Sequence, residues 1–351
     1  MTDAAFVDLV IELDAAVAEA DGHGHGFVET PVVDGSALAA AAGLDIDLVI
    51  KTEPHNVGGS HKARHLMGVA IHLRIAEALG EPIPERLAIA SCGNAAIGAS
   101  VIAKALDRPL DVFVPTWADA SVIDQLEQLE ASIQRCERRE GEAGDPCYLR
   151  FSEAVAAGAA AFSVQGVDTP STFDGGRTIG WELAEQVGDL DAIYVQVGGG
   201  ALATSVSMAL NDGTRPSVAL YPVQAEGCAP LRRAWDLLAP DFDFTAAEAS
   251  PEKYMWPWEN PQSYATGILD DVTYDWLPLL KATLASGGEP IVATEALMLK
   301  AHELAKIETG VPVCSTGVAG LAGLLHQPLV QADGAPKPRV ALLFTGIDRS
   351  L

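Results

Sequence analysis

The sequence is poor in basic residues and rich in acidic ones. Its 22 lysines and arginines are outnumbered by 48 aspartates and glutamates, which leaves a formal net charge of −26 at pH 7. A surface with this charge repels nucleic acid and anionic membranes, so we expect neither as a partner. The plainer interpretation is that the acidity only keeps the protein soluble.

Long apolar runs and cysteines are also scarce. The longest nearly apolar run, residues 154–164, is far too short to cross a bilayer. The first twenty residues hold acids but no base, unlike a signal peptide. The cysteines are odd in number and show no metal-ligand spacing, so we expect no bound metal and a cytoplasmic location. They are Cys92, Cys136, Cys147, Cys228 and Cys314.

The rest of the sequence alternates short β-rich runs with helical patterns. With 351 residues and 49% apolar side chains, the chain is long enough for a substantial core and two lobes. Short connections between alternating strands and helices predict a doubly wound α/β architecture. We expect strands at 48–52, 87–90, 110–115, 161–164, 191–197, 217–223 and 339–344. We expect helices at 4–20, 36–42, 63–79, 95–106, 120–137, 151–161, 179–187, 201–210, 295–308 and 318–325, and irregular structure at 236–275.

One lysine stands between a glycine turn and a helical pattern. Residues 56–65 read Asn-Val-Gly-Gly-Ser-His-Lys-Ala-Arg-His, and the lysine is Lys62. At such a place a lysine binds phosphate, pairs with a carboxylate, or acts as an amine nucleophile that forms a Schiff base. To be a nucleophile it must lose its proton, which burial and nearby positive groups such as His61 and Arg64 favour.

A second glycine turn lies between an expected strand and an expected helix. Gly198-Gly-Gly-Ala-Leu directs several backbone N–H groups toward one point, where the helix dipole also favours an anion. The stretch from Gly198 to Ala203 also fits a relaxed dinucleotide fingerprint, which requires an acid after the next strand. Glu226 comes a few residues too late for that role. We favour a cofactor phosphate over a dinucleotide, and a tight turn without ligand stays open.

Four motifs together resemble a known enzyme family. Glu29-Thr-Pro-Val-Val, Gly59-Ser-His-Lys-Ala-Arg, Ser91-Cys-Gly-Asn-Ala and Gly198-Gly-Gly-Ala-Leu resemble, in order and spacing, the fold type II pyridoxal-phosphate enzymes. This superfamily, similar to the tryptophan synthase β chain, includes threonine synthase and the serine and threonine ammonia-lyases. The resemblance implies two doubly wound open-sheet domains with the cofactor in the cleft between them, and a homodimer. It implies a large cofactor-binding domain, residues 1–62 and 178–351, and a small mobile substrate domain, residues 63–177.

The resemblance also assigns roles to residues. Lys62 is expected to carry pyridoxal phosphate as a Schiff base and to transfer protons once released, with His61 near the phosphate. The phosphate is expected to bind Gly198, Gly199, Gly200, Ala201 and Leu202. The substrate carboxylate is expected to bind Ser91, Cys92, Gly93, Asn94 and Ala95, while Asn94 also contacts the cofactor ring oxygen. Thr316, with Ser315 as second choice, is expected to face the pyridine nitrogen; a helix N-cap is an equally good interpretation of both.

Two departures from the family pattern concern substrate choice. Cys92 stands where the family often has serine, and Ala95 where threonine or histidine is common.

A neutral hydroxyl at Thr316 leaves the ring nitrogen unprotonated, which favours elimination and replacement over transamination.

Other stretches look most like threonine synthase. They are Arg177-Thr-Ile-Gly-Trp, Gln224-Ala-Glu-Gly-Cys and Ala265-Thr-Gly-Ile. A threonine synthase needs basic residues for a second phosphate, and the candidates are Arg150, Arg177 and Lys253. The aromatic residues Trp256, Trp258, Tyr264 and Tyr274 form either a lid or ordinary packing. A monovalent cation as a second cofactor stays open.

Three hypotheses follow. The first is a pyridoxal-phosphate lyase or synthase that performs β- or γ-elimination or replacement on a small amino acid through Lys62. The second is a nicotinamide-dependent oxidoreductase that uses Gly198 to Ala203. The third is a catalytically inactive relative that binds an amino acid.

Overall fold

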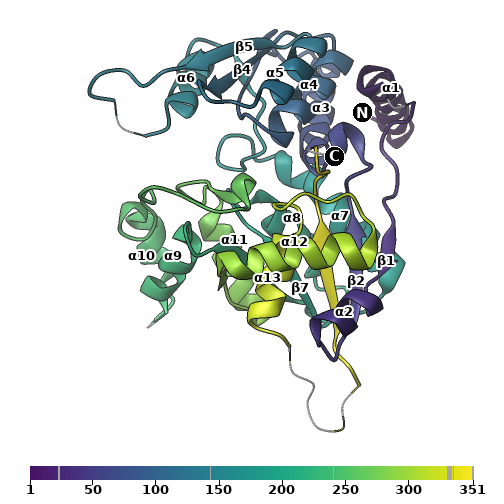
Figure 1. Cartoon of the computed structure of the whole chain (residues 1–351). Helices are drawn as coiled ribbons and strands as arrows, with labels where there is room; N and C mark the ends of the chain where they lie inside the picture. The colour runs from purple at the N-terminus through teal and green to yellow at the C-terminus, as the bar shows by residue number, and fades with distance from the viewer. Residues whose placement is uncertain (23, 143, 240, 330–333, 335, 350–351) are drawn as a thin grey trace. The chain divides into compact units, whose positions relative to one another are not determined.

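The computed structural model describes residues 1–22, 24–142, 144–239, 241–329, 334 and 336–349. The chain forms two compact units (Figure 1). The first contains Met1–Val28 and Asn56–Gly176, and the second contains Glu29–His55 and Arg177–Leu351.

The first unit is built on a parallel sheet with the strand order β5-β4-β3-β6. Its strands are β3 (Leu87–Ala90), β4 (Leu110–Pro115), β5 (Ser132–Cys136) and β6 (Ala160–Ala161). Its helices are α1 (Asp3–Asp21), the short 3-10 helix η1 (Val57–Gly59), α3 (Lys62–Ala78), α4 (Asn94–Ala105), α5 (Ala120–Gln128) and α6 (Pro146–Ala156). The helix α7 (Thr172–Val187) begins in this unit and continues into the second.

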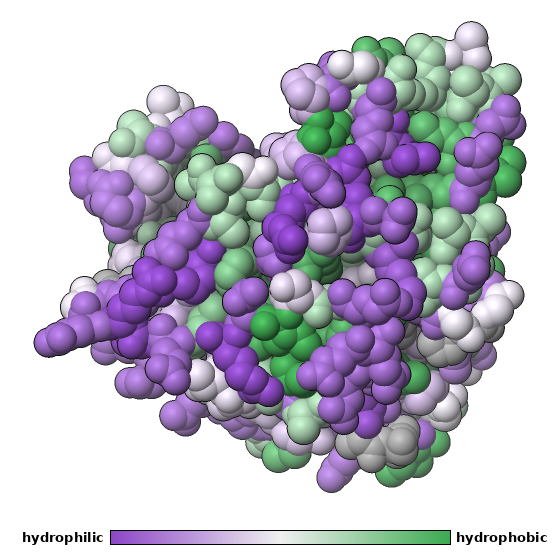
Figure 2. Space-filling view, turned by 90° about the horizontal axis from the view of Figure 1, so that it is seen from above, coloured by the Kyte–Doolittle hydropathy of each residue, from purple (hydrophilic) through white to green (hydrophobic). Residues whose placement is uncertain are grey.

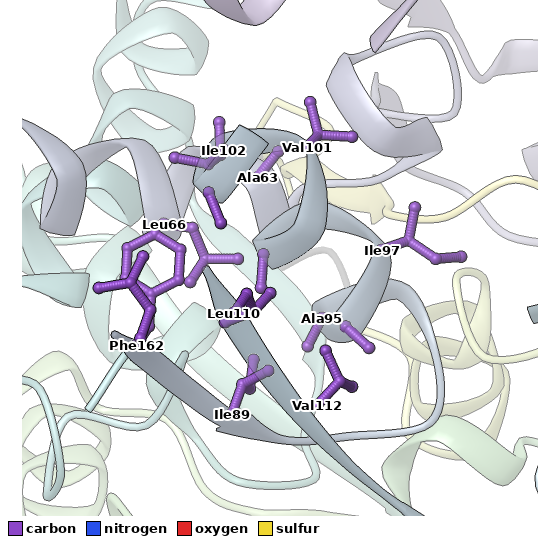
Figure 3. Packing of buried hydrophobic residues seen from close by; sticks show 14 of the residues in the cluster. Ala63, Leu66, Ile89, Ala95, Ile97, Val101, Ile102, Leu110, Val112 and Phe162 are labelled. Atoms are coloured by element: carbon purple, nitrogen blue, oxygen red, sulfur yellow. The ribbon is translucent and has the colours of Figure 1, made fainter. Parts of the chain in front are cut away.

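Alternate residues of these strands face two apolar clusters. Leu87 and Ile89 of β3 belong to the larger cluster, which also takes residues from α1, α3, α4 and α5 (Figure 3). Ala88 belongs to a smaller cluster with Phe113 of β4 and Phe151 of α6. Side chains of a strand alternate between its two faces, so helices cover both faces of this sheet.

The second unit is built on a six-stranded sheet with the order β1-β2-β10-β7-β8-β9. The strands are β1 (Val32–Asp34), β2 (Asp47–Thr52), β7 (Ala192–Gln196), β8 (Ala219–Ala225), β9 (Ile291–Ala293) and β10 (Arg339–Phe344). The edge strand β1 is antiparallel to β2, and the other pairs are parallel. The helices are α2 (Ser36–Ala42), α8 (Ala201–Leu210), α9 (Pro230–Leu238), α10 (Phe244–Ala249), α11 (Trp276–Ser286), α12 (Glu295–Thr309) and α13 (Ala319–His326), with 3-10 turns η2 (Pro251–Lys253) and η3 (Thr266–Ile268).

The sheet of the second unit is also covered on both faces. In β10, Val340 and Leu342 share one cluster with α2, α12 and α13, the helices drawn in front of the strands in Figure 1. Ala341 and Leu343 point the other way, into a cluster with α7, α8, α9 and α11. Both units are therefore doubly wound, as the sequence predicts.

A buried ion pair ties β2 to α7 in the second unit. Lys51 is fully buried, and its ammonium group donates to the Thr30 carbonyl at 2.6 Å, to Glu182 Oε2 at 2.6 Å and to Gln186 Oε1 at 2.8 Å. The Thr30 hydroxyl donates in turn to Glu53 Oε1 at 2.6 Å. The strand that precedes the lysine loop is thus fixed by a polar network inside the unit.

Three expected elements are wrong. The expected helix at 151–161 is the helix α6, which begins at Pro146 and ends at Ala156. The expected helix at 120–137 is the shorter helix α5, followed by the strand β5. Glu130 takes a left-handed conformation with φ +63°, which turns the chain so that β5 can pair with β4. The expected helix at 179–187 begins earlier, at Thr172, and includes Gly175. A Cβ atom on Gly175 would overlap the Arg64 carbonyl oxygen, so this glycine serves close packing of α7 on α3 rather than a turn.

The irregular stretch expected at 236–275 holds the helix α10 and the two 3-10 turns.

The N-terminal segment also differs from expectation. The sequence placed residues 1–62 with the C-terminal part of the chain, whereas Met1–Val28 and the residues from Asn56 onward group with the first unit. Leu13 and Val17 of α1 lie in the larger apolar cluster of that unit, which accounts for the grouping.

Hydrophilic residues make up much of the face drawn in Figure 2, with apolar residues in separate patches. Within the described residues, no helix has both the length and the apolar character that a membrane span requires.

Candidate functional site

The lysine loop belongs to the first unit. Asn56 is the N-cap of η1, and its side-chain oxygen accepts a hydrogen bond from the Val57 N–H at 2.9 Å. Gly58 and Gly59 have φ of +64° and +70°, a left-handed region that favours glycine. The loop then ends at Lys62, the first residue of α3. The glycines therefore serve the sharp turn that places Lys62 at a helix N-terminus.

The lysine loop packs directly on α4. A Cβ atom added to Gly98 would lie 3.2 Å from the Ala63 nitrogen, and one added to Gly58 would lie 3.4 Å from the Gly98 Cα. These small residues let the two backbones approach closely. The structure thus brings the loop of Lys62 onto the helix that begins at Asn94, so two expected site segments lie on neighbouring elements of one unit.

The expected carboxylate-binding turn joins β3 to α4. The Ser91 N–H donates to the Phe113 carbonyl at 3.2 Å, and the Gly93 N–H faces Ser91 Oγ at 3.4 Å. Gly93 is the N-cap of α4 and offers no side-chain cap, while a Cβ atom there would meet no atom within 4 Å. The first N–H groups of a helix have no partner within the helix. The turn therefore places a helix N-terminus, which suits an anion, beside open space at Gly93.

His65 lies one turn along α3 from Lys62 and is buried. Its Nδ1 is 2.9 Å from the Thr172 carbonyl oxygen, and since a carbonyl oxygen only accepts, Nδ1 carries the ring proton. Burial first, and the positive charges of Lys62 and Arg64 after it, lower the pKa of His65 to about 3. The imidazole is therefore neutral near pH 7 and adds no charge beside Lys62.

The second glycine turn belongs to the second unit, between β7 and α8. Gly200 is the N-cap of α8 with φ +104°, and its carbonyl accepts from the Thr204 N–H at 3.1 Å and from the Thr204 hydroxyl at 3.0 Å. The Asp275 N–H donates to the Gly199 carbonyl at 2.8 Å. These carbonyls are engaged within the unit, and the N–H groups of the turn lie at a helix N-terminus, a position that suits an anion.

The segment before Asp275 runs close along this turn. A Cβ atom on Gly198 would overlap the Asp270 carboxylate and lie 3.1 Å from the Ile268 Cα. A Cβ atom on Gly200 would lie 3.2 Å from the Thr273 side chain. Only glycine fits at these two positions without movement of the neighbouring segment.

Thr316 lies near the same turn within the second unit. Its Oγ1 accepts a hydrogen bond from the Gly267 N–H at 2.9 Å, so its own proton stays available for donation. The Ser315 hydroxyl instead donates to the Tyr264 carbonyl at 3.1 Å. The Gln196 side chain at the end of β7 donates to the Gly317 carbonyl at 2.9 Å and thereby joins this segment to the strand that leads into the glycine turn.

The family follows from a comparison with known proteins. The model of the family described as pyridoxal-phosphate dependent enzyme matches residues 25–346. The chain belongs to this family. Its cofactor is pyridoxal phosphate, and this membership replaces the dinucleotide interpretation of Gly198 to Ala203.

Two curated family members illustrate the similarity. An L-threonine ammonia-lyase of Thermotoga maritima is 30% identical over 211 residues, which cover 58% of this chain and 49% of the relative. The aligned part thus spans about half the length of that relative. A phenylserine dehydratase of Ralstonia pickettii is 27% identical over 300 residues, covering 82% of this chain and 87% of the relative.

Solved structures share the fold. Maize serine racemase has a TM-score of 0.73 at 19% identity, covering 97% of this chain and 94% of its own. The processed form of threonine deaminase isoform 2 from Solanum lycopersicum has a TM-score of 0.73 at 16% identity, covering 100% of this chain and 92% of its own. They confirm the fold type II architecture with two parallel-sheet domains.

The residues present fit pyridoxal phosphate. The first unit carries an amine at Lys62, and the second carries a glycine turn at a helix N-terminus, which suits a phosphate, and the hydroxyl of Thr316. Lys51 does not compete for the cofactor, because its three ammonium protons already have three acceptors, one of them a carboxylate. A nucleophilic lysine needs a free lone pair, which such a paired ammonium lacks.

Sequence reasoning missed the residues that support Thr316 and Gly198. Gly267 belongs to the stretch Ala265-Thr-Gly-Ile, whose resemblance does not indicate a contact with Thr316, and Asp270, which contacts Gly198, follows that stretch. His65 lies within the lysine motif, but its neutral state depends on its burial, and its tautomer depends on Thr172, more than a hundred residues away. No signal in the sequence marks such long-range contacts.

Proposed function

We propose that this chain is a pyridoxal-phosphate-dependent ammonia-lyase that eliminates water from a small β-hydroxy amino acid. The observation that carries the proposal is the hydroxyl of Thr316, which keeps its proton for donation because Oγ1 accepts from Gly267. A hydroxyl opposite the ring nitrogen, in place of a carboxylate, favours elimination over transamination. The names of the two curated relatives, an ammonia-lyase and a dehydratase, support the same chemistry.

The cofactor is held by three groups in this proposal. Lys62 binds it covalently through its amine, the turn from Gly198 to Leu202 binds its phosphate, and Thr316 donates to its ring nitrogen. His61 borders the phosphate, and Asn94 contacts the ring oxygen. Bound pyridoxal phosphate supplies an electron sink for negative charge at the substrate α carbon.

The substrate is held by the turn from Ser91 to Ala95, whose backbone N–H groups bind its carboxylate. The Lys62 amine would take the proton from the substrate α carbon. The bond between the β carbon and its hydroxyl then breaks, and the hydroxyl leaves as water after it takes up one proton. Hydrolysis of the remaining nitrogen-bearing product gives ammonia and a 2-oxo acid.

Elimination of water is favoured over a threonine synthase reaction. That reaction needs a basic cluster for a second phosphate, and Arg150 was one candidate. Its guanidinium is paired with Glu142 and, at 3.0 Å, with Glu153. These two carboxylates hold the guanidinium and oppose the binding of a phosphate by Arg150.

The proposal extends to the molecule as a whole. We propose a cytoplasmic homodimer in which the first unit, Met1–Val28 and Asn56–Gly176, forms the small mobile substrate domain and the second unit forms the large cofactor-binding domain. Sedimentation of the purified protein at twice the mass of one chain would support the dimer. Turnover in potassium, sodium and tetramethylammonium salts would decide whether a monovalent cation takes part.

The proposal is tested by incubating the holoenzyme with serine, threonine, phenylserine, phosphohomoserine and diaminopropionate. We expect ammonia and a 2-oxo acid from a β-hydroxy amino acid, and no product from Lys62→Ala. Lys104→Ala is the control, since Lys104 pairs with the exposed Glu130 in the same unit. Bound cofactor without any product would contradict the proposed activity and indicate an inactive amino-acid-binding relative.

A further inference from the structure

Tyr264 and His302 form a hydrogen-bonded pair whose direction is fixed. His302 Nε2 lies 3.0 Å from the Val313 carbonyl oxygen, and since that oxygen only accepts, Nε2 carries the ring proton. The Asp348 carboxylate, 3.9 Å from Nε2, favours the same tautomer. Nδ1 is therefore the acceptor, and the Tyr264 hydroxyl donates to it at 2.8 Å.

This pair joins the two segments that meet at Thr316. The Ser315 hydroxyl donates to the Tyr264 carbonyl at 3.1 Å, and the Gly267 N–H donates to Thr316 Oγ1 at 2.9 Å. His302 binds the first segment through Tyr264 and the second through Val313. The Thr316 hydroxyl thus lies in a closed set of hydrogen bonds to which α12 contributes the His302 ring.

Burial differs between the two partners. The His302 residue is only 8% exposed, and its ring is bound at both nitrogens. Tyr264 is 42% exposed, so apolar packing fixes its ring less firmly than it would fix a core residue. The hydroxyl bond to His302, together with the Tyr264 N–H bond to Glu295 Oε2 at 2.8 Å, therefore holds Tyr264 in place.

We propose that Tyr264 and His302 are positioning residues that hold the Thr316 hydroxyl in the orientation that meets the cofactor ring nitrogen. The proposal rests on the role assigned to Thr316 under the proposed function. Tyr264 is then part of the fixed support of the site and not a lid over it. Loss of its hydroxyl releases Gly267 and Thr316 from a common frame without removing any group that touches the cofactor.

A double-mutant cycle on cofactor affinity tests this proposal. The dissociation constant of pyridoxal phosphate is measured by absorbance, without substrate, for the wild type, Tyr264→Phe, Thr316→Val and the double variant. We expect Tyr264→Phe to raise the constant about fivefold, the effect of one hydrogen bond. In the Thr316→Val background the same change has an effect of less than about twofold, because the hydroxyl that it positions is gone.

Two further sets of variants separate positioning from general stability. Tyr148→Phe is the matched control, since the Tyr148 hydroxyl binds Asp168 in the first unit, and we expect no change in cofactor affinity. His302→Asn keeps an acceptor near the position of Nδ1, whereas His302→Gln keeps only the donor to Val313. We therefore expect His302→Asn to retain more cofactor affinity than His302→Gln.

An equal effect of Tyr264→Phe in both backgrounds would overturn the proposal, as would an unchanged affinity in Thr316→Val. The readout is independent of the proposed activity. A protein that binds the cofactor at Lys62 but consumes no amino acid contradicts the ammonia-lyase assignment, while the cycle still reports on Tyr264 and His302.

Discussion

At the scale of single residues, the two lysines at the ends of residues 51–62 have different environments. Lys51 is buried in a network of three acceptors, whereas Lys62 opens a helix after a glycine turn. The ammonium of Lys51 stabilises the second unit, and the amine of Lys62 is the one that we assign to chemistry. Both residues are lysines, and in the sequence only the motif around Lys62 distinguishes one from the other.

Removal of the Lys51 charge should strongly destabilise the protein. Lys51→Met leaves the Glu182 carboxylate, itself only 18% exposed, without its cation, and breaking such a pair costs about 3 kcal/mol. Urea unfolding measures the change. Lys281→Met is the control: Lys281 and Glu248 are 3.7 Å apart and largely exposed, so we expect little change. Equal effects of the two substitutions would contradict the role of the buried network.

The neutral His65 should make stability depend on pH. The unfolded chain protonates this ring near pH 6.5, but the folded protein does so only near pH 3, so the unfolded state binds more protons between these values. Stability therefore falls as the pH drops through this window, by about 2 kcal/mol between pH 7 and pH 5 from His65 alone.

His65→Asn tests this pH effect. The asparagine amide can still donate to the Thr172 carbonyl but does not titrate. Urea unfolding at pH 7 and pH 5 should show a smaller loss of stability in the variant than in the wild type. The same pH dependence in both proteins would mean that His65 is not the group responsible.

At the scale of elements, the turn from Gly198 to Leu202, which we propose binds the phosphate (the phosphate turn), should tolerate no side chain at its first glycine. A Cβ atom on Gly198 would overlap the Asp270 carboxylate and press on the Ile268 backbone, so Gly198→Ala must displace the turn or that segment. We expect the affinity for pyridoxal phosphate to fall at least about tenfold, since phosphate binding depends on the direction in which the N–H groups point.

Gly180→Ala is the matched control for the phosphate turn. Its Cβ atom would lie 2.6 Å from the Ala209 side chain, which is also too close, but between α7 and α8 and away from the turn. This variant should be less stable, yet its folded form should bind the cofactor with an affinity close to that of the wild type. Equal loss of affinity in both variants would show general overpacking and not a specific phosphate site.

The sequence predicts elements well where local pattern and tertiary contacts agree. The helix expected at 201–210 coincides with α8, because the glycine turn before it and the apolar pattern within it both indicate a helix there. Helix 120–137 fails because β5 depends on its pairing with β4, which no local pattern reveals. The helix expected at 179–187 is too short because Gly175 lies within α7, where its contact with Arg64 depends on a residue far away in the chain.

At the scale of the whole molecule, family and fold were accessible from the sequence because four motifs follow one another in the family order. The contacts that support the site were not accessible from the sequence. Thr316 depends on Tyr264, Gly267 and His302, which come together only through the fold of the second unit. Such contacts join residues dozens of positions apart, so the spacing of residues along the chain does not predict them.

The central claim concerns Lys62 as the residue that binds the cofactor covalently. Reduction of the holoenzyme with borohydride makes that bond permanent, and mass spectrometry of the digested protein then locates it. The account predicts one reduced pyridoxyl group per chain, on the peptide that contains Lys62. A label on Lys51 or any other lysine, or no label at all, would contradict it.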